Sequence, residues 1–150
     1  MNPFSLYPFL RNVPLVRSLA DKVSTAFFLA GATEPSRYVS YSSTSLPNDF
    51  LVTVLGTEFT ARLEYFKFIS NGTESVAGQF YFFENIDGEE RRLATVLRML
   101  APSDVIFPDG THMDATDLDP RTGMATIMRD KLSTALLAEQ VGKMGSWSFN

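Results

Sequence analysis

Hydrophobic residues recur at three- and four-residue spacing near both ends of the chain, which predicts an amphipathic helix at each end. The first helix is expected over residues 13–30, where Pro14 fits the first turn. Asn12 is its expected N-cap and Gly31 its stop signal. A short additional turn of helix is expected from Pro3 onward. The buried stripe of the first helix consists of Val16, Leu19, Ala20, Val23, Phe27 and Ala30.

The last helix is expected to start near the Asp119-Pro120 step, because an acidic N-cap followed by proline is a helix-start signal. Gly145 is its expected terminator. Its buried stripe is predicted to comprise Met124, Ile127, Met128, Leu132, Ala135 and Leu136, continuing to Val141. Beyond this helix, Trp147 and Phe149 are expected to fold back onto the core, since an unused tail rarely keeps two large aromatics.

Between the helices the pattern changes to the alternation and β-branched richness of strands. Residues 50–55 are predicted to form a buried strand, and residues 37–41 an edge strand within a polar connection. Residues 105–107 predict a further short strand that follows the Ala101-Pro102 break. Leaving aside the edge strand, these and the three strands of the hairpins described next make about five strands.

Two turn signals, Asn71-Gly72 and Asp87-Gly88, predict two consecutive two-residue hairpins. The first pairs Ala61 with Phe82, Arg62 with Tyr81, Leu63 with Phe80 and Tyr65 with Gly78. The second pairs Phe82 with Leu93, Glu84 with Arg91, Phe83 with Arg92, Gly78 with Leu97 and Val76 with Met99. Both turns independently put the same apolar side chains on one face, and a one-residue slip would scatter them. These are Phe59, Ala61, Leu63, Tyr65, Phe80, Phe82, Leu93 and Leu97.

The elements together predict one α+β domain over residues 1–150, an antiparallel meander of about five strands. An N-terminal and a C-terminal helix are expected to pack on its apolar face. The chain has 150 residues, of which 45% are hydrophobic and 20% charged, and this is typical of a soluble globular protein. The absence of cysteine excludes disulfides and thiolate chemistry.

Charge narrows the classes of partner. The net charge is -4, and five aspartates fall within residues 104–119 without an intervening lysine or arginine. A chain without a basic stripe is not expected to bind nucleic acid. No apolar run approaches the roughly 18 residues that span a membrane, so no membrane partner is expected. The first residues lack a basic signal-peptide region, which favours a cytoplasmic location.

The reverse face of the meander carries aromatic and arginine side chains together. Aromatics and arginine are enriched at binding hot spots, so this face predicts a non-enzymatic module for protein association, including a homodimer. The alternative is that the arginines, or the N-terminal segment, cover the rings. The candidate binding residues are Arg62, Phe66, Phe68, Tyr81, Phe83 and Arg92.

A second hypothesis is a small enzyme or small-molecule binder, for a small apolar ligand, with a cavity between sheet and helices. Its acid-base pair would be His112, the only histidine, with Asp114. The same segment contains weak candidates for hard-cation ligands in Asp114, Asp117 and Asp119, although their spacing does not fit a calcium loop. Neither a bound metal nor a cofactor is expected.

Overall fold

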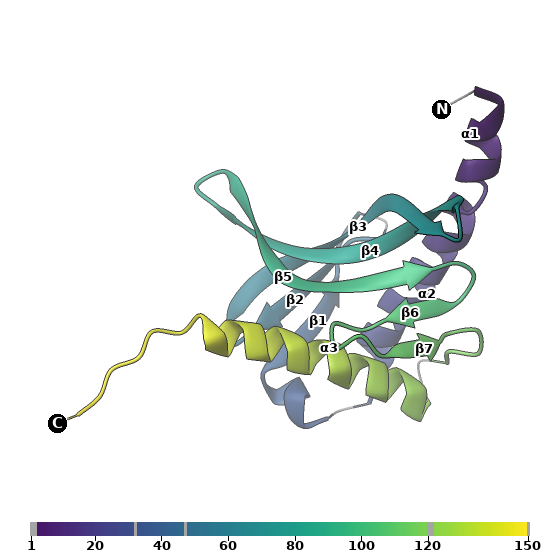
Figure 1. The fold of residues 1–150 in the computed structure, drawn as a ribbon. Coiled ribbons are helices and arrows are strands. Elements are labelled where there is room, and N and C mark those ends of the chain that lie inside the picture. Colours follow the sequence, from purple (N-terminus) through teal and green to yellow (C-terminus); the bar gives the residue numbers. More distant parts are fainter. Residues whose placement is uncertain (1–2, 32, 47, 120–121, 150) are drawn as a thin grey trace.

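A computed structural model of the protein describes residues 3–31, 33–46, 48–119 and 122–149. Its helical elements are α1 (Pro3–Leu10), α2 (Val13–Leu29), the short 3-10 helix η1 (Glu34–Arg37) and α3 (Gly123–Gly142). Seven strands form one antiparallel sheet in sequence order (Figure 1). They are β1 (Val39–Ser43), β2 (Phe50–Val54), β3 (Thr57–Ser70), β4 (Thr73–Ile86), β5 (Glu89–Leu100), β6 (Asp104–Ile106) and β7 (His112–Asp114).

The α+β class with helices at both ends is confirmed, and the expected number of strands is too low. The last strand, β7, has three residues and pairs with the equally short β6. Three residues are too few to show alternation, so the sequence pattern misses such a strand. The sheet is curled, and β1 lies at one edge as expected (Figure 1).

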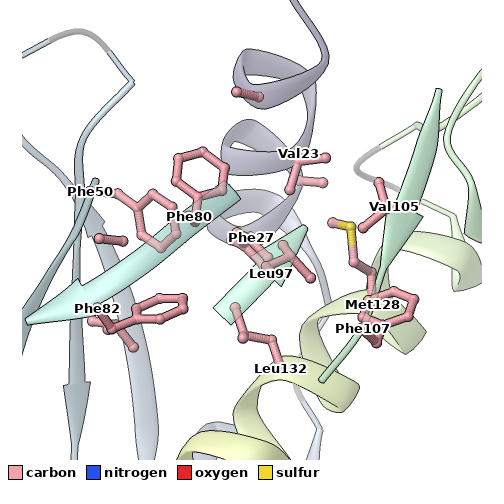
Figure 2. Packing of buried hydrophobic residues seen from close by; sticks show 14 of the residues in the cluster. Val23, Phe27, Phe50, Phe80, Phe82, Leu97, Val105, Phe107, Met128 and Leu132 are labelled. Atoms are coloured by element: carbon pink, nitrogen blue, oxygen red, sulfur yellow. The ribbon is translucent and has the colours of Figure 1, made fainter. Parts of the chain in front are cut away.

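The core lies between the curled sheet and the helices α2 and α3. Figure 2 shows rings from β2 and β4 packing toward side chains of both helices. The largest fully buried side chains include Phe27, Phe50, Phe80, Phe82, Met128 and Leu132. These residues are 0% exposed, and their packing fills the space between the sheet and the two helices.

The first hairpin has the predicted turn and register. Asn71 and Gly72 have φ values of 51° and 76°, the left-handed conformation that asparagine and glycine tolerate best. Leu63 lies opposite Phe80 and Arg62 opposite Tyr81. The turn chemistry of two residues therefore sets the faces of two fourteen-residue strands.

The second hairpin follows the predicted register only near its turn. Phe83 lies opposite Arg92 as expected, but Tyr81 lies opposite Val96. Between these pairs β5 contains extra residues, so Gly78 lies opposite Met99 and not opposite the predicted Leu97. This is a β-bulge. Because the shift is even, Leu93, Leu97 and Met99 still point to the core, and the predicted faces hold.

A carboxylate from α3 binds the backbone that the bulge releases from the ladder. Glu139 accepts hydrogen bonds of 2.8 Å from the backbone N–H groups of Ala94 and Thr95, and one of 2.7 Å from the Thr95 hydroxyl. Partial burial disfavours its charge, yet these donors and the nearby Lys143 lower the pKa of Glu139 to about 2. The bulge therefore depends on a helix more than forty residues away in the sequence.

Close packing of α2 on the sheet depends on a glycine in β4. A Cβ at Gly78 would lie 2.5 Å from the Val16 methyl Cγ1 and 3.1 Å from the Leu63 Cδ1. Tyr65 lies opposite Gly78 as predicted, but it is 40% exposed and is not part of the buried face. The helix, and not the cross-strand tyrosine, therefore occupies the space above this glycine.

The predicted first helix is confirmed, and its buried stripe contains Val16, Leu19, Ala20, Val23 and Phe27. The predicted face of the last helix is partly wrong, because Met124, Ile127 and Val141 are exposed. Its buried residues are Ala125, Met128, Leu132, Ser133 and Leu136. The helix begins at Gly123 with Thr122 at its N-cap position, so the predicted Asp119 N-cap is wrong, and Pro120 lies outside the described residues. The expected fold-back of the tail is wrong, since Trp147 and Phe149 are 83% and 93% exposed.

Within the described ranges, none of the helices has the length and hydropathy needed to cross a bilayer.

Candidate functional site on the outer sheet face

We refer to the face of the sheet that points away from α2 and α3 as the outer face. Alternate residues of β3, β4 and β5 supply its side chains, because successive residues of a strand point to opposite faces. The outer face divides into two regions. One is a cluster of arginines and aromatic rings, and the other is a recess beside it.

The arginine-aromatic cluster contains Arg62, Tyr81, Phe83 and Arg92. The rings of Tyr81 and Phe83 stack with centroids 5.4 Å apart. The Arg92 guanidinium carbon lies 3.8 Å from the Tyr81 centroid, and that of Arg62 lies 4.8 Å from the Phe83 centroid. Each arginine thus covers the ring diagonal to itself, which lies two residues along β4 from its own cross-strand partner. Under these two guanidinium groups Tyr81 is 6% exposed and Phe83 is 2% exposed.

Acidic side chains hold both arginines over the rings. Arg62 Nε lies 3.2 Å from an Asp49 carboxylate oxygen, and its Nη1 lies 3.5 Å from Glu90. The hydrogen bond to Asp49 raises the pKa of Arg62 further above its ordinary value. Arg92 Nη1 lies 3.2 Å from a Glu64 oxygen. In this region acidic side chains neutralise both arginines, and the arginines cover the two rings, as the alternative interpretation of this face expects.

Beside the cluster lies a recess of about 500 Å3. Two of the predicted binding residues, Phe66 and Phe68, line it and are only half-buried. The other side chains that line it include Glu64, Gln79, Arg98, Leu100 and Ile106. The structure therefore separates the six predicted residues, with four in the cluster and two at the recess.

Arg98, Leu100 and Ile106 are among the recess residues that the sequence did not predict to bind a partner. Strand alternation already places Arg98 on the outer face. Its neighbours could not be predicted, because the bulge in β5 shifts Arg98 from a position opposite Ala77 to one opposite Gln79. No turn or glycine within β5 signals this bulge in the sequence.

His112 lies on β7 with an exposed side chain, and its Nδ1 is 3.0 Å from an oxygen of Asp104. The carboxylate of Asp114 accepts hydrogen bonds from the backbone and hydroxyl of Thr116 instead. These bonds lower the pKa of Asp114 and close a local turn. The proposed partners of an acid-base pair are therefore engaged with different residues.

The aspartates that were weak candidates for a cation site do not converge. Across the part of the chain that the structure describes, no group of three or more potential metal ligands occurs. Asp114 is committed to its turn with Thr116, and Asp117 is exposed. The local contacts of this segment fit ordinary turn chemistry.

The outer face is thus a covered cluster next to an open recess, and its interpretation depends on these contacts alone. Comparison of the chain with protein-family models, with curated proteins and with solved structures finds no match.

Proposed function

We propose that this chain is a non-enzymatic binding module that associates with a protein partner, in the first place a second copy of itself, through the outer face of its sheet. The observation that carries the proposal is the half-buried pair Phe66 and Phe68 on the face that points away from α2 and α3, where Phe66 also borders a hollow with Phe9 and Leu10 of α1. Their rings adjoin Leu100 and Ile106 in the recess. Burial of this apolar area against a partner would stabilise a complex.

The neighbouring arginine-aromatic cluster also supports association through the outer face. Arg62 and Arg92 are 40% and 50% exposed, so their outer edges remain available for contact while their inner faces cover the rings. Ordered arginines lose little further conformational freedom when a partner docks. Two copies that meet through one patch form a closed twofold dimer, which is the commonest way to bury such a surface.

The experiment is a measurement of mass in solution by light scattering over a range of protein concentrations. We expect the unmodified chain to form a dimer and the Phe68→Asp variant to be a monomer, because a carboxylate at the interface centre would be buried without a partner. Ile69→Asp is the matched control, since Ile69 is the next residue of β3, points to the opposite face and is 62% exposed.

The control variant is expected to keep the mass of the unmodified chain. A monomeric unmodified chain at all concentrations would refute self-association. A dimer that survives Phe68→Asp with a native circular dichroism spectrum would place the interface on another face.

A further inference from the structure

The recess has a mixed lining that an apolar protein contact alone does not require. Strand register aligns Glu64, Gln79, Arg98 and Ile106 in one row across β3, β4, β5 and β6. The apolar side chains of Phe66, Phe68, Leu100 and Ile106 complete the walls. Its volume of about 500 Å3 lies within the range of sites for small molecules.

Arg98 is the polar group in this row without a partner. Its side chain is exposed and makes neither an ion pair nor a hydrogen bond with any residue in the described part of the chain. The acid of the same row, Glu64, is already bound by Gln79 at 2.6 Å and by Arg92 at 3.2 Å. The guanidinium of Arg98 therefore keeps its donors available for a group from outside the chain.

Arg98 is also accessible from two sides. A second hollow of about 240 Å3 shares Arg98 and Ile106 with the recess and continues to Phe107 and Pro108. Arg98 therefore lines both surface hollows. A planar acceptor that enters the larger recess can take two parallel hydrogen bonds from it.

We propose that this recess binds a small carboxylate that carries an apolar ring or a short alkyl chain. The carboxylate pairs with Arg98, and the apolar group lies against Phe66, Phe68 and Ile106. A dianionic phosphate fits less well, because the site offers one unpaired cation and the Glu64 carboxylate lies in the same row. One chain supplies all of the site's residues. Because Phe66 and Phe68 also carry the proposed association, a bound carboxylate and a second copy compete for the recess.

The test is calorimetric titration of the full chain with phenylacetate, with octanoate and with the neutral phenylacetamide. We expect at least one of the two carboxylates to bind once per chain with a dissociation constant below about 1 mM, in keeping with the small size of these probes. The amide should bind at least about tenfold more weakly, because it lacks the charge that strengthens the hydrogen bonds to arginine.

Two charge-removing variants on the same strand separate the site from a general electrostatic effect. Arg98→Gln should weaken binding of the carboxylate at least about tenfold and leave the amide unchanged. Arg91→Gln is the matched control, because Arg91 is an exposed arginine of β5 on the far side of the bulge. It should bind phenylacetate and octanoate like the unmodified chain.

Nuclear magnetic resonance locates the site independently of any variant. Addition of the carboxylate should shift the backbone amide signals of Gln79, Arg98 and Ile106 more than those around Arg91. The inference is overturned if neither carboxylate binds below about 1 mM, if acid and amide bind equally, if Arg98→Gln has no effect, or if the shifted signals lie elsewhere. The titrations are made at concentrations at which light scattering finds the chain monomeric, so that association does not block the recess and each proposal fails on its own measurement.

Discussion

The two regions of the outer face are built from the same residue types and differ in their supply of acids. In the cluster, Arg62 is paired with Asp49 and Glu90, and Arg92 is paired with Glu64. In the recess, Arg98 lies in one row with Glu64, but the Glu64 carboxylate is already bound by Gln79 and Arg92. Whether an arginine on a sheet covers its neighbours or remains available for a ligand therefore depends on which acids lie within reach, more than on the aromatic rings around it.

The largest expected effect on stability concerns the aromatic rings of these two regions. Phe83→Ala should lower the free energy of unfolding by about 3 kcal/mol or more, because a ring that is 2% exposed leaves a cavity beneath the arginines. Phe68→Ala at the recess should cost about half of that, since its half-exposed ring gives up less burial. Urea unfolding followed by circular dichroism measures both values.

Equal losses in the two variants would contradict the division of the face into a covered and an open region. A smaller loss of stability in Phe83→Ala than in Phe68→Ala would mean that the recess, and not the cluster, is the covered region. Ile69→Ala, at an exposed position of β3, is the control for mutation of a strand residue and should change stability little.

Local chemistry is what made much of this fold predictable from the sequence. The Asn71-Gly72 turn set the register between β3 and β4, and strand alternation then gave the correct face for Tyr81 and Phe83. Helix α2 was predictable because its apolar stripe has a regular period. In α3 the stripe contains small residues such as Ala125 and Ser133, so the larger Met124 and Ile127 suggested the wrong face.

The features that sequence reasoning missed depend on partners distant in the chain. The bulge in β5 is held by Glu139 of α3, and no residue of β5 is a sequence signal for it. Burial of Tyr81 depends on Arg92 reaching diagonally across the strands, which a register alone does not indicate. Two of the six predicted binding residues do line the recess. The unpaired Arg98 at its wall could be recognised only once the contacts of Glu64 were known.

The second prediction concerns this bulge, because it decides where Arg98 lies. Glu139 has its pKa lowered from 4.5 to about 2, so its charged form stabilises the fold above pH 4.5. This contribution should fall away as the pH drops from 4.5 toward 2 and the carboxylate of the folded chain takes up a proton. Glu139→Gln should cost about 2 kcal/mol near neutral pH, less than the full linkage value because solvent screens part of the interaction.

Denaturant unfolding of the unmodified chain and of Glu139→Gln at a series of pH values measures this difference. The gap between the two should narrow as the pH falls through the interval between the two pKa values. Glu74→Gln, at an exposed glutamate of β4, is the control and should show a small gap without this trend. A constant gap for Glu139→Gln would mean that the charge of its carboxylate does not hold the bulge.

The smallest expected effect compares the two arginines directly. Arg92→Gln should lower the free energy of unfolding by about 1 kcal/mol, because it removes a contact with the Tyr81 ring and an ion pair that is partly exposed. Arg98→Gln should change it by less than about 0.5 kcal/mol, since Arg98 has no described partner to lose.

A double-mutant cycle with Glu64→Gln sharpens this comparison, because it isolates the pairwise energy from the other effects of each substitution. Arg92 and Glu64 should couple by about 0.5 kcal/mol or more, and Arg98 and Glu64 by nearly nothing. Strong coupling between Arg98 and Glu64 would mean that the arginine turns to this acid in solution. Its guanidinium would then be satisfied within the chain, and the recess would resemble the cluster.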